Sequence, residues 1–586
     1  MNKKYWQNFG ELNQSDAFKQ STADEFKEEL LPLADMDDKG LLDGKTPRRD
    51  FLKYLGFSTA AAALAASCDT PVRKAVPFLN KPDNAIAGVA NYYASTYVNG
   101  GDAISVVVKQ RDGRPIKIEG NELSTITKGG TNAQAQASVL DLYDTTRLRH
   151  PLQRDGKDYK EVSTFDAFDK LVAGDLASLG GKPVVLLTST IHSPSTLQLI
   201  NNFLAKYPGS RHVQYDALSY SGMLSANEAC YGKRALPSYH FDKAKTIVSL
   251  GADFLGTWLS PVEFSRQYGA IKRIKGDKPS ISRHIHFESM LSLTGSNADD
   301  RFTHKPSETA AIATALLAKL GGAVSGGQVK DPALAKGIDK AAAALLATKG
   351  EALVVCGSND RNIQVIVNAI NEAIGANGTT INWAVTSNYR KGNDAELVKL
   401  VADMNAGGIG AMFIADCNPA YNYADSKSFI SGLAKVPVTV SFNGTMDETT
   451  ELCKYIIPSH HWLESWGDTE PKSGYFSLQQ PLISPLFKTR AFQTSLLKWS
   501  GGATATAPAA VQDSTGKQVA AAPVVTGTAN DYETYFRNYW TNKLGGAESF
   551  DKALQDGVVE PATAPAPASS AFNASVLAEA TAKLSS

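Results

Sequence analysis

The residues that could hold an inorganic cofactor are spread thinly along the chain. Five cysteines occur singly, and no Cys-x-x-Cys pair is among them. The nine histidines are also dispersed, apart from the pairs His284/His286 and His460/His461. An iron–sulfur cluster ordinarily needs several cysteine thiolates close together, so the sequence predicts no cluster within these 586 residues. The cysteines lie mostly in apolar or glycine-rich segments, so we expect buried free thiols.

Polar residues that follow apolar segments are the second set of candidates. These turns read Gly251-Ala-Asp253, Gly357-Ser-Asn359 and Asp416-Cys-Asn-Pro419. Apolar strands spaced by helices predict parallel sheets in doubly wound α/β domains. Ligands of such sheets bind at the carboxyl ends of the strands, so we expect these turns to face a crevice.

A leader precedes the α/β pattern. Arg48 and Arg49, followed by Asp-Phe-Leu-Lys, read as a twin-arginine export signal. The apolar stretch of residues 54–67 is shorter than the roughly 20 residues that span a bilayer. Small residues precede Cys68 as at a lipoprotein cleavage site. We therefore expect Tat export to the periplasmic side of the cytoplasmic membrane, with lipidation at Cys68. The alternative is a buried alanine-rich helix.

Composition excludes several classes of protein. The formal net charge is zero, so no strongly basic surface argues for nucleic acid or for electrostatic membrane docking. Hydrophobic residues make up 43% and charged residues 20%, as in an ordinary globular protein. Beyond the leader, no apolar run is long enough to predict a transmembrane helix.

A hairpin opens the region that carries a family resemblance. Residues 104–109 and 115–119 flank Asp112-Gly113, a pair typical of tight hairpin turns. The hairpin, the later Leu-Tyr-Asp and Pro-Leu segments, the turns at Gly251 and Asn418, and the block of residues 447–468 occur in one order. In that order they resemble the molybdopterin oxidoreductase superfamily. The resemblance runs from about residue 88 to residue 499, and each motif alone is weak.

The resemblance implies an α/β, molybdopterin-oxidoreductase-like multi-domain fold. It would have doubly wound parallel sheets and a small N-terminal β-hairpin domain, and the superfamily's C-terminal barrel is not matched. The expected divisions are a polar extension with the signal (1–67), a tether (68–87), a β-rich domain (88–155), two interleaved α/β domains (156–500), a linker or insertion (501–530) and a helical segment (531–586), which we expect to continue into a longer chain.

Departures from the family pattern are as informative as the matches. Active members hold a [4Fe–4S] cluster with cysteines where this chain has residues 91–101 and 128–138, and neither segment contains a cysteine. Cys230 lies about where the family's molybdenum ligand would fall, but a buried thiol is favoured over a metal ligand. The family's turns make Gly251, Asp253, Asn418 and Glu448 candidates for a vestigial pterin pocket.

Within the superfamily, the combination resembles the N-terminal, molybdopterin-like half of the large iron–sulfur subunit of bacterial alternative complex III. That group implies a non-catalytic scaffold in a quinol-oxidising respiratory complex, with no cofactor in this region. It implies Fe–S clusters only in a C-terminal half beyond residue 586 and c-type haem in partner subunits. The implied partners are multihaem cytochrome c subunits, a polytopic quinol-oxidising membrane subunit and a terminal oxidase, with no nucleic acid.

Two other functions stay open at this point. The first is an active bis-pterin molybdenum oxidoreductase of the polysulfide or thiosulfate reductase type, with Cys230 on the metal. The second is a two-lobed periplasmic binding protein that uses the strand-end crevice for an organic ligand. The aromatic-rich segment of residues 531–555 is predicted to form one helix, whose aromatic side chains around residues 535–540 serve either as an interface or as core.

Overall fold

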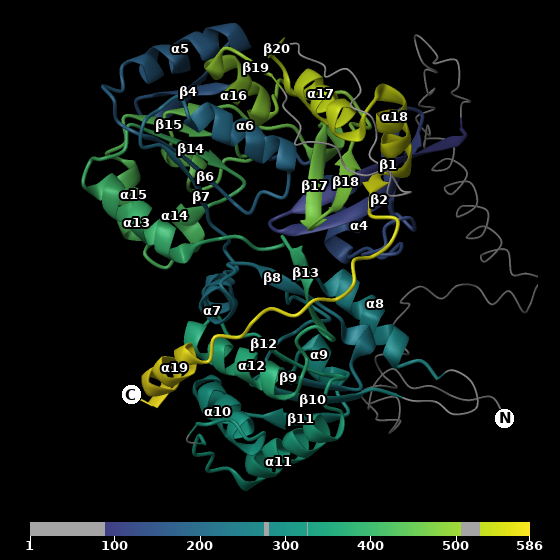
Figure 1. Ribbon diagram of the computed structural model, residues 1–586. Helices are drawn as coiled ribbons and strands as arrows, with labels where there is room; N and C mark the ends of the chain where they lie inside the picture. The colour runs from purple at the N-terminus through teal and green to yellow at the C-terminus, as the bar shows by residue number, and fades with distance from the viewer. Residues whose placement is uncertain (1–87, 275–280, 325, 505–527, 586) are drawn as a thin grey trace, which may run out of the picture. The chain divides into compact units, whose positions relative to one another are not determined.

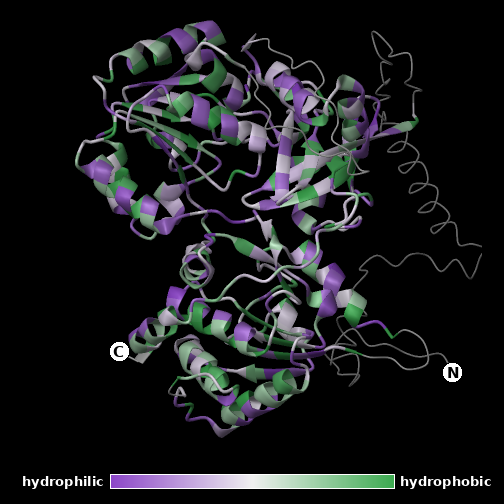
Figure 2. Cartoon of the chain, in the orientation of Figure 1, coloured by the Kyte–Doolittle hydropathy of each residue, from purple (hydrophilic) through white to green (hydrophobic). Residues whose placement is uncertain are grey.

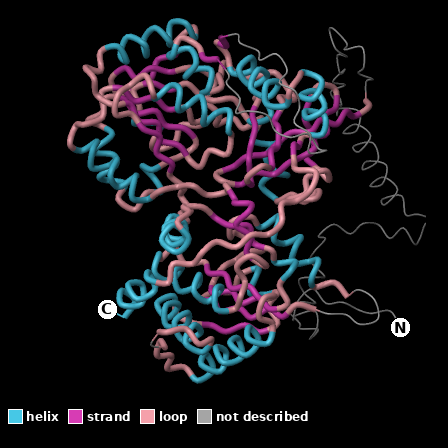
Figure 3. Tube along the Cα trace, in the orientation of Figure 1, coloured by secondary structure: helices cyan, strands magenta, loops and turns pink. Residues whose placement is uncertain are grey.

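The computed structural model describes residues 88–274, 281–324, 326–504 and 528–585 (Figure 1). Arg48, Arg49 and Cys68, with the expected tether, lie outside these residues, as does most of the expected linker. The described chain is mixed α/β, with the sheets and helices distinguished in Figure 3. None of its helices is long and apolar enough to cross a bilayer.

A three-stranded antiparallel sheet begins the described chain. It has the order β1 (Ala90–Asn99), β2 (Asp102–Arg111) and β3 (Arg114–Gly120), and α4 (Ala133–Asp141) packs on it. Asp112 and Gly113 both have positive φ, at 50° and 77°, as a tight hairpin turn requires. The predicted hairpin is therefore confirmed.

The largest sheet has seven strands, in the order β5-β4-β16-β15-β14-β6-β7. Neighbours from β16 to β7 are parallel, as predicted. Helices cover both faces, so the central strands alternate between two apolar cores and read as continuous apolar runs. The bounds are β4 Leu152–Asp155, β5 Asp158–Glu161, α5 Phe165–Ala177, β6 Val184–Thr188, α6 Pro194–Leu204, β7 Arg211–Gln214, α13 Asp394–Asn405, β14 Ala411–Ala415, α14 Pro419–Asn422, α15 Ser426–Leu433, β15 Val438–Ser441, β16 Tyr455–Ile456 and α16 Phe492–Ser500.

A second parallel sheet has four strands, in the order β11-β10-β9-β12. The chain leaves the seven-stranded sheet after β7, builds this second sheet, and returns at β14. The bounds are α7 Ser221–Tyr231, α8 Pro261–Ile271, β9 Thr246–Leu250, β10 Arg283–Glu288, α9 Leu293–Ser296, β11 Asp300–Thr303, α10 Thr309–Lys319, α11 Pro332–Ala347, β12 Ala352–Cys356 and α12 Arg361–Ala373.

A five-stranded sheet combines β8 and β13 from the middle of the chain with three later strands, the short strands β19 and β20 pair with each other, and three helices follow near the C-terminus. The sheet order is β21-β18-β17-β13-β8. The expected single aromatic helix is two helices, because Gly545 and Gly546 have φ of 77° and 157° and interrupt it. The bounds are β8 Leu236–Tyr239, β13 Ile381–Ser387, β17 Gly467–Lys472, β18 Tyr475–Gln479, β19 Ala503–Thr504, β20 Thr528–Ala529, α17 Tyr532–Leu544, α18 Ala547–Asp556, β21 Val558–Val559 and α19 Ser575–Ser585.

The aromatic side chains of α17 belong to the core. Tyr535, Phe536 and Trp540 are fully buried beside α6 and α16, so they pack within the chain. Figure 2 shows hydrophobic and hydrophilic residues interleaved along the helices. The interface alternative for this helix is therefore not needed to explain its composition.

Candidate functional site

A crevice lies at the carboxyl edge of the seven-stranded sheet. Its central part has a volume of about 620 Å³ and is lined by the turns after β6, β14, β15 and β16 together with the β1–β2 turn. A second hollow of about 470 Å³ shares Asp416 and Gly444 with it. A third, of about 560 Å³, shares His460, Trp466 and Tyr532. The three hollows adjoin one another where parallel sheets bind ligands, and we call them together the crevice.

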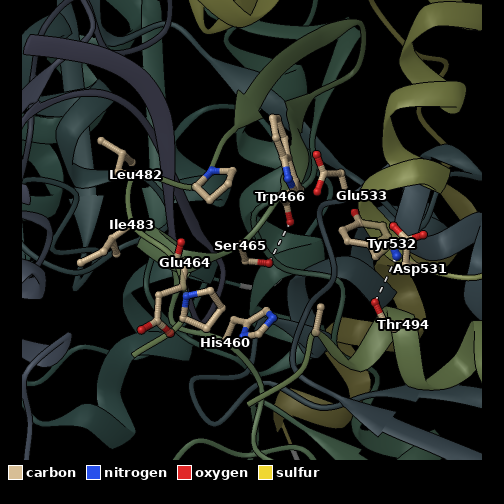
Figure 4. A pocket seen from close by; sticks show the side chains of 14 residues that line it. His460, Glu464, Ser465, Trp466, Leu482, Ile483, Thr494, Asp531, Tyr532 and Glu533 are labelled. Atoms are coloured by element: carbon tan, nitrogen blue, oxygen red, sulfur yellow. Dashed lines mark hydrogen bonds between the residues drawn. The ribbon is translucent and has the colours of Figure 1, made fainter. Parts of the chain in front are cut away.

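The third hollow is shown in Figure 4. Trp466, the residue before β17, and Tyr532, the first residue of α17, line this hollow. His460 lies opposite them. The Tyr532 backbone N–H donates to Thr494 Oγ1 at 3.1 Å, which ties α17 to α16. Pro481, Leu482 and Ile483 complete an apolar rim.

Of the predicted pocket residues, Asn418 lines the second hollow and Glu448 lies beside it. Asn418 Nδ2 donates to Glu448 Oε2 at 2.7 Å, and this bond lowers the pKa of Glu448. Asn418 Oδ1 accepts from Thr449 Oγ1 at 2.7 Å and from its backbone N–H at 3.2 Å. The side chain of Asn418 therefore ties the turn after β14 to the loop after β15.

Gly251 and Asp253 belong to the other parallel sheet, at the carboxyl end of β9. Gly251 has φ of 67°, a conformation that favours glycine, and Gly357 approaches its carbonyl too closely for a Cβ. Asp253 Oδ1 accepts from Thr294 N at 3.0 Å and from Thr294 Oγ1 at 2.7 Å. The predicted pocket residues thus fall into two pairs on two sheets.

Asp468 is a site residue that sequence reasoning missed. Its carboxylate is 3% exposed and lies at the N-terminus of α6, the helix that follows β6. It accepts from Ser195 N at 3.3 Å, from Ser195 Oγ at 2.7 Å, from Ser193 Oγ, and from Trp540 Nε1 at 2.9 Å. Burial raises the pKa of Asp468, and these hydrogen bonds oppose that rise.

Asp216 is the second missed residue. It follows β7 and is 4% exposed. Its carboxylate accepts from Thr190 N at 2.9 Å, from Thr190 Oγ1 at 2.7 Å and from Gly392 N at 3.0 Å. A Cβ on Gly392 would lie 2.8 Å from Asp216 Oδ2, so glycine is needed there. No local sequence signal reveals this contact, because the donors are 26 and 176 residues away.

The two arginines that line the crevice are already paired. Arg147 donates to both carboxylate oxygens of Glu464, at 3.3 and 2.7 Å, and both side chains are buried. Arg390 lies 3.4 Å from Asp102. Desolvation lowers the pKa of the neighbouring Lys391, which weakens its hold on a proton. The crevice therefore offers little unpaired positive charge.

His192 is one of the buried polar groups of the crevice that lack a hydrogen-bond partner within the described residues, together with Ser459 Oγ and Trp462 Nε1. It is 3% exposed, lines the central part, and within the described residues neither ring nitrogen has a hydrogen-bond partner. Burial, with Lys391 and Arg390 nearby, lowers the pKa of His192 to about 3. The ring is therefore neutral at physiological pH and can both donate and accept a hydrogen bond.

Cys230 does not lie in the crevice lining. It is fully buried in α7 within the core of the four-stranded sheet, and burial raises its pKa to about 11. Within the described ranges no group of three His, Cys, Asp or Glu side chains is placed to hold a metal ion. The four described cysteines are free, and three of them are fully buried.

Comparison with known proteins identifies the fold. No family model matches the chain. Acetylene hydratase from Pelobacter acetylenicus superposes with a TM-score of 0.52 over 70% of this chain and 69% of that one, at 14% identity. The fold is that of the molybdopterin oxidoreductases. The molybdopterin-binding-like subunit of menaquinone reductase from Nitratidesulfovibrio vulgaris is 26% identical over 510 residues, which cover 78% of this chain and 72% of that protein.

The cofactor of molybdopterin oxidoreductases is a pterin nucleotide, whose phosphates need N–H donors or cations. In α/β folds these donors are the amides after the strands and at helix N-termini. In this chain, internal carboxylates accept from several of these amides: Asp216 from Thr190 N at 2.9 Å, Asp468 from Ser195 N at 3.3 Å and Asp447 from Thr450 N at 2.7 Å. A phosphate at one of these positions would meet a carboxylate at hydrogen-bond distance, so these positions do not fit the phosphates of this cofactor.

Proposed function

We propose that this chain is a non-catalytic scaffold subunit of a quinone-linked respiratory electron-transfer complex. The observation that carries the proposal is the pair of buried carboxylates, Asp216 and Asp468, which occupy the anion-binding positions of the crevice. The similarity to a menaquinone reductase subunit that is itself named molybdopterin-binding-like supports the respiratory setting.

The more specific part of the proposal is the identity of the complex. The chain corresponds to the molybdopterin-like half of the large iron–sulfur subunit of alternative complex III, on the periplasmic side of the cytoplasmic membrane. Its partners are then multihaem cytochrome c subunits, a polytopic quinol-oxidising membrane subunit and a terminal oxidase. Tat export through Arg48 and Arg49, and a lipid on Cys68, deliver it there.

Purification of the native complex with metal analysis tests this function. We expect c-type haem and a polytopic membrane subunit to co-purify with the chain, and molybdenum to remain far below one atom per chain. Intact mass of the isolated subunit reports cleavage and lipid at Cys68 in the same preparation. Molybdenum near one atom per chain would instead establish the active enzyme, and a monomer without partners would contradict the scaffold.

One observation favours a second candidate function. The crevice keeps a volume of about 620 Å³ beside the unpartnered, neutral His192. A two-lobed binding protein for a small uncharged ligand would use such a site. Native mass spectrometry of the purified chain distinguishes the two, because a retained organic ligand that is lost in His192→Ala supports the binding protein.

A further inference from the structure

The outer end of the β1–β2–β3 sheet is uncovered. The inner residues of β1, from Ala94 to Tyr97, are buried, whereas Tyr92 and Tyr93 nearer its start are 58% and 40% exposed. On β3, Ile116 is 46% exposed. In Figure 1 the strands extend past α18. We call residues 88–93 and 108–117 the hairpin tip.

The hairpin tip lies far from the crevice. The opposite end of β1, at Asn99, lines the crevice, and β1 has ten residues. At about 3.3 Å per residue the tip is roughly 30 Å from that end. Side chains of the tip are therefore free to have a role that the crevice does not explain.

Positive charge is concentrated at the hairpin tip, although the whole chain has a formal net charge of zero. Lys117 pairs with the exposed Glu119 at 3.4 Å, and Arg111 lies 3.9 Å from Asp112. Lys117 Nζ also donates to Ile118 O and Gln136 Oε1, and Lys109 Nζ lies 5.8 Å from the centre of the Tyr92 ring, but none of these contacts adds a further carboxylate. The tip contains one carboxylate, Asp112, and Glu119 lies next to the tip. It contains four cationic side chains: Lys109, Arg111, Arg114 and Lys117.

We propose that the hairpin tip docks on an anionic lipid surface. Tyrosine beside lysine and arginine is the composition found where proteins meet the headgroup layer. Each such cation near an anionic leaflet strengthens binding about fivefold. The inference deepens the proposed function, since it rests on the proposed location at the periplasmic face of the membrane.

The arrangement of the apolar side chains favours a bilayer over an acidic protein. Tyr92 and Tyr93 are neighbours on one strand and therefore point to opposite faces of the sheet. Ile116 adds exposed apolar surface on β3. A protein partner buries one continuous patch of roughly 800 Å² per side, whereas the headgroup layer can surround both faces of a projecting hairpin.

The described chain begins at the hairpin tip, on the C-terminal side of the expected lipid anchor, Cys68. Gly88 is at the tip, where its N–H donates to Asp112 Oδ1 at 3.1 Å. Nineteen residues separate Gly88 from Cys68. Their fully extended reach of about 65 Å is the upper limit on the distance between the tip and an acyl group on Cys68.

Vesicle co-sedimentation tests the proposal. The full chain carries Cys68→Ala, so that no acyl group contributes, and is mixed with phosphatidylglycerol-containing or pure phosphatidylcholine vesicles. The test variant is Lys109→Gln/Arg114→Gln. The matched control is Lys330→Gln/Lys349→Gln, which removes the same charge from exposed positions outside the tip. Tyr92→Ser/Ile116→Ser tests the apolar part.

We expect the chain to bind anionic vesicles, and we expect 0.5 M salt to weaken that binding. Vesicles of pure phosphatidylcholine should not bind the chain. The Lys109/Arg114 variant should bind about 30-fold more weakly, and the control should bind like the parent. No binding to anionic vesicles, or equal loss in the control, overturns the proposal. Loss of a protein subunit from the native complex in the tip variant, without vesicle binding, would assign the tip to that partner instead. Neither result changes the molybdenum content, so the proposed function is judged separately.

Discussion

Removal of the Asp468 carboxylate is the sharpest test of the filled crevice. In Asp468→Ala, the hydroxyls of Ser193 and Ser195, the Ser195 N–H and the Trp540 indole N–H lose their acceptor. Hydrogen bonds to a charged group contribute about 1.5–3 kcal/mol each, and the cost of burying the carboxylate offsets part of that sum. We expect the free energy of unfolding to fall by about 4 kcal/mol.

The same variant should become responsive to small anions. The donors that lose the carboxylate can bind formate. With a Kd of about 10 mM, 100 mM formate would raise the free energy of unfolding by about 1.4 kcal/mol. Urea unfolding followed by tryptophan fluorescence and far-UV circular dichroism measures both effects. The control is Asp403→Ala, which removes a half-buried carboxylate paired with Arg211 and Lys399, and should cost less than about 1 kcal/mol without rescue.

Two results would refute this reasoning. The first is an Asp468→Ala variant within about 1 kcal/mol of the parent, which would mean that the four donors find other partners. The second is equal stabilisation of the parent, the variant and the control by formate, which would mean that the anion acts on the protein in general. Asp468→Asn, which keeps one acceptor oxygen, should lie between the parent and Asp468→Ala.

Three further predictions follow from buried groups. His192 and His284 have pKa values lowered to about 3, so the unfolded chain binds more protons below pH 6.5. The contribution of these two side chains to the free energy of unfolding is complete above that pH and should fall by about 4 kcal/mol between pH 7 and pH 5, and His212, His460 and His461, with pKa values lowered to about 4, add to the fall that urea midpoints report. Arg147→Ala leaves the charge of the buried Glu464 without its partner and should lower the free energy of unfolding by about 3–5 kcal/mol, as thermal unfolding would report. The double variant Arg147→Met/Glu464→Leu removes both charges and should recover most of that loss. The buried thiols have raised pKa values of about 11 to 12, so they should react with a thiol reagent at pH 8 only after unfolding: Cys230, Cys356 and Cys453.

Several parts of the fold could be predicted from local pattern. The strands β6, β9, β12 and β14 are continuous apolar runs because helices cover both faces of each parallel sheet. The β2–β3 turn follows from Asp112-Gly113, and α6 from its Ser-Pro start. The extent of the aromatic helix was wrong, because Gly545 and Gly546 divide it into α17 and α18.

The candidate site was predictable only in part. Asn418 stands directly after an apolar strand, and its place at the crevice follows from that position. Asp216 and Asp468 have no such signal. Asp468 takes its donors from residues 275 positions before it and 72 positions after it, and only packing brings these segments together.

By itself, the sequence determined the fold class, since strand composition, turn residues and their order are local properties of the chain. It also predicted no iron–sulfur cluster, because the five cysteines occur singly along the chain. Only the tertiary structure decided what fills the carboxyl edge of the seven-stranded sheet. A hydrogen bond depends on distances of about 3 Å between atoms that packing brings together, and the spacing of Thr190, Asp216 and Gly392 along the chain does not encode those distances.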